Sequence, residues 1–323
     1  MTASEPTADG AVGPSRLRRI LLVLCGVALG LLAALTLVRL TGLDSGTVLA
    51  MPVAGFPVAS AGTVLLLAAL LAARSRRLAL AAAVLVVVQV CCLAPRFVPS
   101  GQDVPAAAPR LRVGTSNTHV GRVDPAALVE LVRSERLDVL AVQELTADGV
   151  RALDAAGLLD LMPYRELHPE VDSSIYSRLP LANGGLRHLP TTWPQTAAEV
   201  TVGGRTVRLV AVHTYYPAGD PDRWTRDMTA LRAEAGPDAV VLGDFNATLD
   251  HAPMRALLDA GLVDTHAELG RGWAPTWPAD GALPPLLQLD HVLHGSGLAG
   301  VSVREQTLPG TDHRAVVAEL AVR

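Results

Sequence analysis

The chain has no lysine, and its three cysteines are confined to its apolar N-terminal part. Because Cys25, Cys91 and Cys92 are its only thiols, the rest of the chain cannot form a disulfide, build a cysteine zinc site or use a thiol nucleophile. The net charge of −4 gives no sign of a surface that binds polyanions. All 27 fixed positive charges are Arg, whose planar fork suits phosphate, although a coding bias gives the same composition.

Long hydrophobic runs dominate the first hundred residues. Half of the chain is hydrophobic and its mean hydropathy is +0.34, which is high for a soluble enzyme. The runs cover residues 20–38, 53–73 and 78–93, and the last extends to residue 97 if Arg96 snorkels. We therefore predict three transmembrane helices within residues 20–97, preceded by a disordered cytoplasmic segment at residues 1–19.

Two other structures are compatible with such runs. A signal peptide also begins with basic residues before an apolar stretch, but its apolar region is shorter and a small-residue cleavage site follows it. Here more apolar sequence follows the first run instead. A buried helical hairpin of a soluble protein is the remaining alternative.

Arginines flank the apolar runs on one side of the predicted membrane. They lie before the first run (Arg16, Arg18 and Arg19) and in the turn between the second and third runs (Arg74, Arg76 and Arg77). The positive-inside rule places both clusters in the cytoplasm. We therefore expect a multi-pass protein of the cell membrane, with a cytoplasmic N-terminus and with the chain extracytoplasmic after residue 93.

The character of the sequence changes after a Pro- and Ala-rich segment at residues 98–109, which is typical of a linker. In the domain that follows, at residues 110–323, short apolar bursts predict strands at residues 111–113, 139–143, 207–212, 239–242 and 290–293. Helices are expected at residues 125–134, 223–235 and 252–261, the first capped by Asp124. The pair Gly203-Gly204 indicates a hairpin. This mixture favours an α/β fold of two packed sheets with helices outside.

Polar side chains recur at the ends of the predicted strands. They are Asn117, Glu144, His213, Asp244, Asn246, Asp290, Asp312 and His313. Each one alone is more often a turn former or a structural residue. Their repeated placement carries more information, because strand ends that meet on one rim of a sheet form a site.

The chemistry of these residues is coherent. Glu144, together with Asp312 or Asn117, offers the hard oxygen ligands that Mg²⁺ prefers, and no His- or Cys-based pattern favours zinc. His313 is suited to accept a proton from water, with Asp290 holding its ring in the required tautomer. Asp244 and Asn246 are two residues apart, so an extended segment points them to the same side. His213 is suited to stabilise charge on a phosphoryl oxygen.

The order of these motifs resembles the endonuclease/exonuclease/phosphatase family, which includes deoxyribonuclease I, neutral sphingomyelinases and inositol-polyphosphate 5-phosphatases. The resemblance covers roughly residues 111–320. It rests on Asn117, Val142-Gln143-Glu144, Ile175-Tyr176-Ser177-Arg178-Leu179-Pro180, His213, Gly243-Asp244-Phe245-Asn246-Ala247, Leu289-Asp290-His291-Val292 and Gly310-Thr311-Asp312-His313-Arg314. It implies a four-layered α/β sandwich and a phosphoesterase that uses Mg²⁺ or Mn²⁺.

The resemblance also implies a role for each matching residue. Glu144 would be the principal metal ligand, beside Asn117 and Asp312. Asp244 would orient or deprotonate the attacking water, and Asn246 would contact the phosphate. His213, and His313 oriented by Asp290, would bind and polarise the scissile phosphate, and the sequence leaves open whether Asp or His is the base. The domain differs from secreted nucleases of this type in being short and in having no Cys.

The sequence therefore predicts a membrane-anchored, divalent-metal-dependent phosphoesterase with an extracytoplasmic catalytic domain. A catalytically silent signalling or binding protein that keeps the fold is the alternative, and a transporter is disfavoured because the runs carry no charge within the membrane. The predicted partners are a phosphate ester, either nucleic acid, lipid headgroup or small molecule, and the lipid bilayer. We predict no protein partner. Trp273 and Trp277 are suited to stack on a base, to enter lipid or to pack as a loop.

Overall fold

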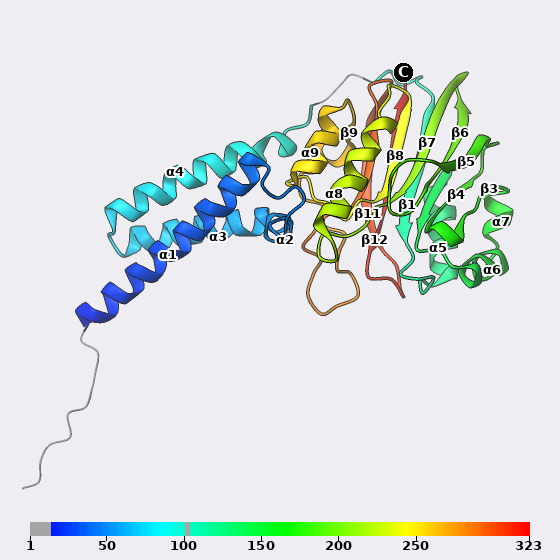
Figure 1. Ribbon diagram of the computed structural model, residues 1–323. Coiled ribbons are helices and arrows are strands. Elements are labelled where there is room, and N and C mark those ends of the chain that lie inside the picture. Colours follow the sequence, from blue (N-terminus) through cyan, green and yellow to red (C-terminus); the bar gives the residue numbers. More distant parts are fainter. Residues whose placement is uncertain (1–13, 101–103) are drawn as a thin grey trace, which may run out of the picture. The chain divides into compact units, whose positions relative to one another are not determined.

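The computed structural model describes residues 14–100 and 104–323 and divides the chain into two compact units (Figure 1). The helical unit contains Pro57–Cys91 together with the residues up to Leu37. The second unit, which holds the domain predicted to be catalytic and is called the catalytic unit below, contains Val38–Phe56 and Cys92–Arg323. A short segment between the first two apolar helices thus belongs to the same unit as the C-terminal domain.

The helical unit is formed by parts of three apolar helices, α1 (Pro14–Thr41), α3 (Phe56–Ala72) and α4 (Arg76–Leu93). Two helices, Arg16–Thr41 and Arg76–Phe97, are long and apolar enough to cross a membrane. The helix α3 is apolar but has only 17 residues, so the prediction of three transmembrane helices is supported for two. Residues 14–19 of the segment expected to be disordered belong to α1, and residues 1–13 lie outside the described residues.

Two six-stranded mixed sheets form the centre of the catalytic unit. The first has the order β11-β12-β1-β2-β4-β3 and contains β1 (Arg110–Asn117), β2 (Val139–Gln143), β3 (Tyr164–Glu166), β4 (Ser173–Ser177), β11 (Leu298–Thr307) and β12 (Arg314–Val322). The second has the order β5-β6-β7-β8-β10-β9 and contains β5 (Ala182–Arg187), β6 (Gln195–Val202), β7 (Arg205–His213), β8 (Ala239–Asp244), β9 (Val263–Asp264) and β10 (Asp290–His294). Gly203 and Gly204 join β6 and β7 in the predicted hairpin.

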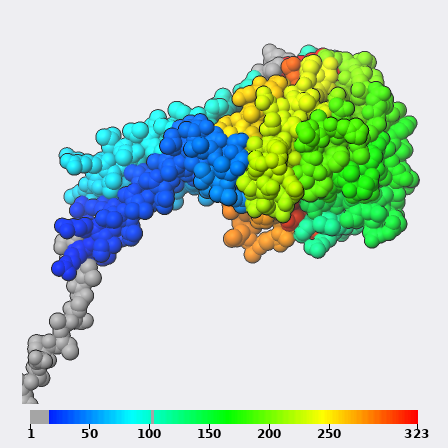
Figure 2. All heavy atoms as spheres, in the orientation of Figure 1, coloured from blue at the N-terminus to red at the C-terminus, as the bar shows by residue number. Residues whose placement is uncertain are grey.

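Helices cover the outer faces of both sheets (Figure 1). In the space-filling view, the yellow and green segments, which include α8, form much of the visible surface of this unit (Figure 2). The helices and short 3₁₀ turns of the catalytic unit are α2 (Ala50–Ala54), η1 (Ala94–Phe97), α5 (Pro125–Glu135), α6 (Ala147–Ala155), α7 (Leu158–Leu161), η2 (Pro169–Val171), α8 (Pro221–Ala230), η3 (Leu231–Glu234), α9 (Ala252–Asp259) and α10 (Thr265–Glu268). One apolar core lies between the sheets, a second under α5 to α7, and a third under α8 and α9. The predicted α/β sandwich of two mixed sheets flanked by helices is confirmed.

Local sequence explains where the main helices begin. The side chain of Asp124 accepts hydrogen bonds from the backbone N–H groups of Ala126 and Ala127, as predicted for the cap of α5. Asp220 caps α8 in the same way, before a proline in the first turn. In place of the single helix expected at residues 223–235, the structure has α8 followed directly by the 3₁₀ turn η3.

The segment Val38–Phe56 is built into the core of the catalytic unit. Ala50 is fully buried in the apolar cluster that contains Trp224, and its carbonyl oxygen lies 2.9 Å from Nε2 of His251. The backbone N–H of Ala252 donates to Oδ2 of Asp44 at 2.7 Å. These contacts make the loop after the first apolar helix a structural part of the C-terminal domain.

A buried ion triad ties two helix ends to this domain. Asp250, whose side chain is fully buried, pairs with Nε of Arg39 at 2.7 Å and with Nη1 of Arg96 at 3.0 Å. Arg39 belongs to the end of α1, and Arg96 belongs to η1, which follows α4. The expectation that Arg96 snorkels is wrong: both its terminal nitrogens donate to Asp250, because a buried carboxylate requires a compensating charge.

Candidate functional site

The sheet topology brings the predicted polar residues to one edge of the sandwich. Asn117 ends β1, and Glu144 follows the parallel strand β2. His213 and Asp244 end the parallel strands β7 and β8 in register with each other. Asp290 begins the antiparallel strand β10 directly opposite Asp244. Residues from 117 to 313 thus meet because the carboxyl ends of both parallel pairs face the same side.

The backbone near the site adopts conformations that side chains usually avoid. A Cβ on Gly243, whose φ is +148°, would lie 2.0 Å from the carbonyl oxygen of Val212, so only glycine fits before Asp244. Glu144 has φ of +53° and Asn246 has φ of +48°, both in the left-handed region. Such conformations persist where the surrounding structure enforces them, and they cluster at functional sites.

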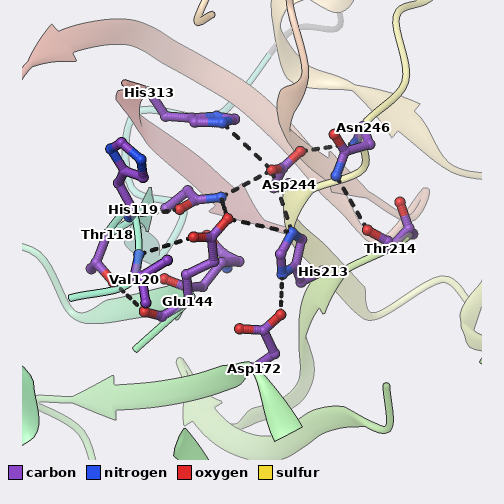
Figure 3. A network of polar contacts seen from close by, with 12 residues as sticks. Thr118, His119, Val120, Glu144, Asp172, His213, Thr214, Asp244, Asn246 and His313 are labelled. Atoms are coloured by element: carbon purple, nitrogen blue, oxygen red, sulfur yellow. Dashed lines mark hydrogen bonds and ion pairs between the residues drawn. The ribbon is translucent and has the colours of Figure 1, made fainter. Parts of the chain in front are cut away.

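Two carboxylates meet at the amide of Asn117. Figure 3 shows these carboxylates, Glu144 and Asp244, beside His213. Nδ2 of Asn117 donates to Oε1 of Glu144 at 3.0 Å and to Oδ2 of Asp244 at 3.1 Å. The second oxygen of Glu144 accepts from the backbone N–H of Val120 at 2.9 Å. The backbone N–H of Asn246 donates to Oδ1 of Asp244 at 2.8 Å, and the Asn246 side chain donates to the carbonyl oxygen of Thr214. The arrangement concentrates oxygen atoms and negative charge at one point.

A histidine–carboxylate pair lies on each side of this centre. Nδ1 of His313 lies 2.8 Å from Oδ2 of Asp290, as the sequence predicted, and Nδ1 of His213 lies 2.7 Å from Oδ2 of Asp172. The opposite ring nitrogens point towards Oδ2 of Asp244, at 3.8 Å for His313 and 3.7 Å for His213. Each carboxylate therefore orients its ring so that Nε2 faces the cavity.

Neighbouring charges set the pKa values of these groups. Burial alone lowers the pKa of His313, but the charges of Asp290 and Asp244 outweigh it and raise that pKa to about 10. Burial alone also lowers the pKa of His213. The hydrogen bond to Asp172 and the charge of Asp244 outweigh burial and raise this pKa above its usual value. Burial raises the pKa of Asp244, against the opposing charge of His313.

Asp312 is placed differently from the other predicted ligands. Within the described residues, its carboxylate contacts His119, at 3.4 Å from Nδ1, and Nε1 of Trp277, at 3.1 Å. It makes no hydrogen bond with Glu144 or Asn117. Its role as a metal ligand therefore stays a prediction. Trp277 also pairs with Leu287, so it belongs to a packed loop.

The centre has the donor chemistry that a hard divalent cation requires. Asp244, Asp290 and His313 each offer a ligand atom within 4.8 Å of the others. However, Oδ2 of Asp290 and Nδ1 of His313 are already hydrogen-bonded to each other. Glu144 and Asp244 instead direct carboxylate oxygens at one shared point, where the amide of Asn117 offers them only a neutral donor. In the described part of the chain no arginine lines the cavity. A bound cation would balance this charge, and the oxygen donors fit Mg²⁺ or Mn²⁺.

The cavity also contains residues that the sequence pattern did not reveal. Its volume is about 340 Å³, and Asp172, Trp193 and Tyr216 line it beside Glu144, His213, Asp244, Asn246 and His313. Asp172 follows the turn η2 in the left-handed conformation, with φ of +78°. An Asp after Pro169 reads as an ordinary turn residue, so no local signal marks it as the partner of His213.

Comparison with known proteins agrees with this arrangement. A family model described as "Endonuclease/Exonuclease/phosphatase family" matches residues 114–313. D. rerio TDP2 complexed with single-strand DNA product is 19% identical, with a TM-score of 0.54, over 66% of this chain and 99% of that chain. The endonuclease/exonuclease/phosphatase protein from Beutenbergia cavernae DSM 12333 is 19% identical, with a TM-score of 0.51, over 66% of this chain and 72% of that chain. At such identities the solved structures show the fold alone, and no curated protein matches the sequence.

Proposed function

We propose that this chain, which belongs to the Endonuclease/Exonuclease/phosphatase family, hydrolyses phosphate esters with a bound divalent metal ion, Mg²⁺ or Mn²⁺. One observation carries the proposal. Glu144 and Asp244 converge on Asn117, between two histidines that are each oriented by a carboxylate. This arrangement offers both metal ligands and proton donors to a phosphate in one cavity.

Each residue has a task that its position supports. Glu144, with Asn117 and Asp312, would hold the cation, which supplies positive charge against a phosphoryl oxygen. Asp244 is placed to orient or deprotonate the attacking water, and Asn246 to contact the phosphate. His213 and His313 are placed to hold a phosphoryl oxygen or to move a proton at Nε2, because Asp172 and Asp290 occupy their Nδ1 atoms.

A catalytically silent protein that keeps the fold is the alternative. Loss of selection for activity would be expected to remove at least one of Glu144, Asp244 and His313. All three are present, and all line the same cavity. The left-handed backbone at Glu144 also argues for function, because such a conformation costs free energy and is found mostly at functional sites.

Membrane anchoring with an extracytoplasmic catalytic unit is the second part of the proposal. The two helices long enough to span a membrane each begin near an arginine cluster, at Arg16 and at Arg76. Each ends in the catalytic unit, where Arg39 and Arg96 bind Asp250. We therefore place the segment Val38–Phe56 and the C-terminal domain on the same side of the bilayer, an arrangement that requires α3 to cross the bilayer as well. The positive-inside rule makes that side extracytoplasmic.

Metal dependence tests the first part. We expect the full-length protein in detergent to hydrolyse bis(p-nitrophenyl) phosphate with Mg²⁺ or Mn²⁺, and EDTA to abolish release of nitrophenolate because the centre then lacks its balancing charge. Readdition of either ion should restore the rate. Full activity in chelator, or restoration by zinc alone, would show that the proposed chemistry is wrong.

Thiol labelling in cells tests the second part. In a background with Cys25, Cys91 and Cys92 replaced by Ala, we compare Ser302→Cys, on the exposed strand β11, with Ser75→Cys, in the turn before α4. A membrane-impermeant maleimide should label Ser302→Cys in spheroplasts, and Ser75→Cys only after permeabilisation. The reverse pattern would place the catalytic unit in the cytoplasm and refute the orientation.

A further inference from the structure

The catalytic cavity has a second, aromatic end beside the polar centre. Trp193, from the loop between β5 and β6, stacks on the ring of His213 with centroids 5.1 Å apart and an interplanar angle of 19°. Tyr215 and Tyr216 follow β7 after Thr214 and stack on each other at 4.6 Å and 15°. Trp193 and Tyr216 line the cavity, and Tyr216 remains 47% exposed.

Buried hydrogen bonds hold this aromatic end in place. The fully buried side chain of Gln195 donates from Nε2 to the carbonyl oxygens of Trp193 and His213, and its Oε1 accepts from the backbone N–H of His213. The buried carboxylate of Asp227 accepts from the backbone N–H groups of Thr192 and Tyr215. Both ring-bearing segments are thus fixed to the strand that carries His213, so a ligand does not have to order them.

The surroundings of Tyr215 and Tyr216 show which ring is free to bind. The guanidinium of Arg223 lies 4.9 Å over the ring of Tyr215 and covers it. Gly219 packs so closely that a Cβ there would lie 2.6 Å from the ring of Tyr216 and 2.9 Å from that of Tyr215. Tyr216 is thus held by its neighbours while part of its ring faces the cavity.

Charge and size restrict what this end can accept. Five of the seven arginines suited to a phosphate-binding rim are paired with carboxylates: Arg178 with Asp138, Arg187 and Arg208 with Glu234, Arg205 with Asp238 and Arg226 with Asp222. The other two are Arg223, which lies over Tyr215, and Arg314, which donates to Thr307 and to the carbonyl oxygen of Pro275. A second phosphate group would therefore find no arginine among the described lining residues, and both lining histidines face Asp244, where the first phosphate is placed. A cavity of about 340 Å³ accommodates a phosphate with one ring.

We propose that Trp193 and Tyr216 form a subsite for an uncharged planar ring, a nucleobase or an aryl group, on the ester substituent of the substrate. Rigid aromatic faces bind planar rings by stacking and tolerate different ring chemistries. This assignment rests on the proposed phosphoesterase function, because it places the phosphate at Glu144, Asp244 and the two histidines. It narrows the substrate from any phosphate ester to one that carries a ring.

Benzylphosphonate and cyclohexylmethylphosphonate provide a matched test, because their C–P bonds are not hydrolysed and they differ chiefly in the planarity of the ring. Calorimetry on the full-length protein with Mg²⁺ should show benzylphosphonate binding about tenfold more tightly than cyclohexylmethylphosphonate. Tyr216→Ala should abolish this preference, and Tyr216→Phe should retain it. Tyr164→Ala, which removes an exposed tyrosine of β3 outside the cavity, should leave the preference unchanged.

The outcomes separate this subsite from the proposed function. Equal binding of both compounds by the unchanged protein would overturn the ring subsite, even if metal-dependent hydrolysis is observed. A preference that survives Tyr216→Ala would also overturn it. A Tyr216-dependent preference without any hydrolysis would support the subsite and refute the phosphoesterase.

Discussion

Replacing Glu144 with Gln is expected to lower the rate of hydrolysis at least about 10²-fold, because it removes charge that balances the cation while keeping the shape of the side chain. Both oxygens of Glu144 are engaged, one by Asn117 and one by the backbone of Val120. The amide of Gln can satisfy only one of these donors. The concentration of Mg²⁺ or Mn²⁺ required for half the maximal rate should therefore rise.

Direct metal binding separates this effect from a general loss of activity. Calorimetric titration with Mn²⁺ should show weaker binding to Glu144→Gln than to the unchanged protein. Glu199→Gln is a matched control, because Oε2 of Glu199 also accepts a hydrogen bond from an Asn amide, that of Asn183, far from the cavity lining. If Glu144→Gln bound Mn²⁺ as tightly as the control does, Glu144 would not be a metal ligand.

The strands and the site residues at their ends could be predicted because their signals are local. Residues 139–143 were predicted as a strand with the observed bounds, since a short apolar run is limited by polar residues on both sides. Asp244 and Asp290 were assigned separately, and the antiparallel register of β8 and β10 brings them opposite each other. The pairing of His313 with Asp290 followed from the chemistry of the two residues, and the family resemblance implied it as well.

Contacts between distant loops could not be predicted in this way. Asp172 lies 41 residues before its partner His213, and Asp250 lies 211 residues after Arg39. Only the assembled sandwich brings each pair together, and neither carboxylate stands in a distinctive local pattern. The contact between Trp193 and His213 could not be predicted from the sequence either, because it forms only when β6 pairs with β7.

The limits of the second apolar run were wrong for a related reason. The sequence predicted one membrane helix over residues 53–73, whereas α2 ends at Ala54 and α3 begins at Phe56. Val53 and Phe56 are fully buried and belong to the catalytic unit. Hydropathy measures only apolar character, so it does not distinguish a side chain that faces lipid from one that packs in a protein core.

The second large effect is expected for His313→Ala, which should lower the turnover rate about 10²–10⁴-fold, as is typical for a positioned acid or base. Nε2 of His313 faces the cavity, 3.8 Å from Asp244, so its loss removes help to the phosphoryl group or the attacking water. The metal concentration at half-maximal rate should remain nearly unchanged, in contrast to Glu144→Gln. His294→Ala is the matched control, because it breaks another buried histidine–carboxylate pair, with Glu268, outside the cavity lining.

Asp290 should act only through His313, and a double change tests this. Asp290 is fully buried and does not line the cavity, while its Oδ2 holds Nδ1 of His313 at 2.8 Å. Asp290→Ala should lower turnover, but combining it with His313→Ala should cost little more than His313→Ala alone, because residues that work as a unit are not additive. Thermal unfolding of all variants verifies that they are folded at the assay temperature. If the two losses multiplied, Asp290 would have a separate task, such as binding the metal beside Asp244, and the assignment of His313 and Asp290 as one unit would be wrong.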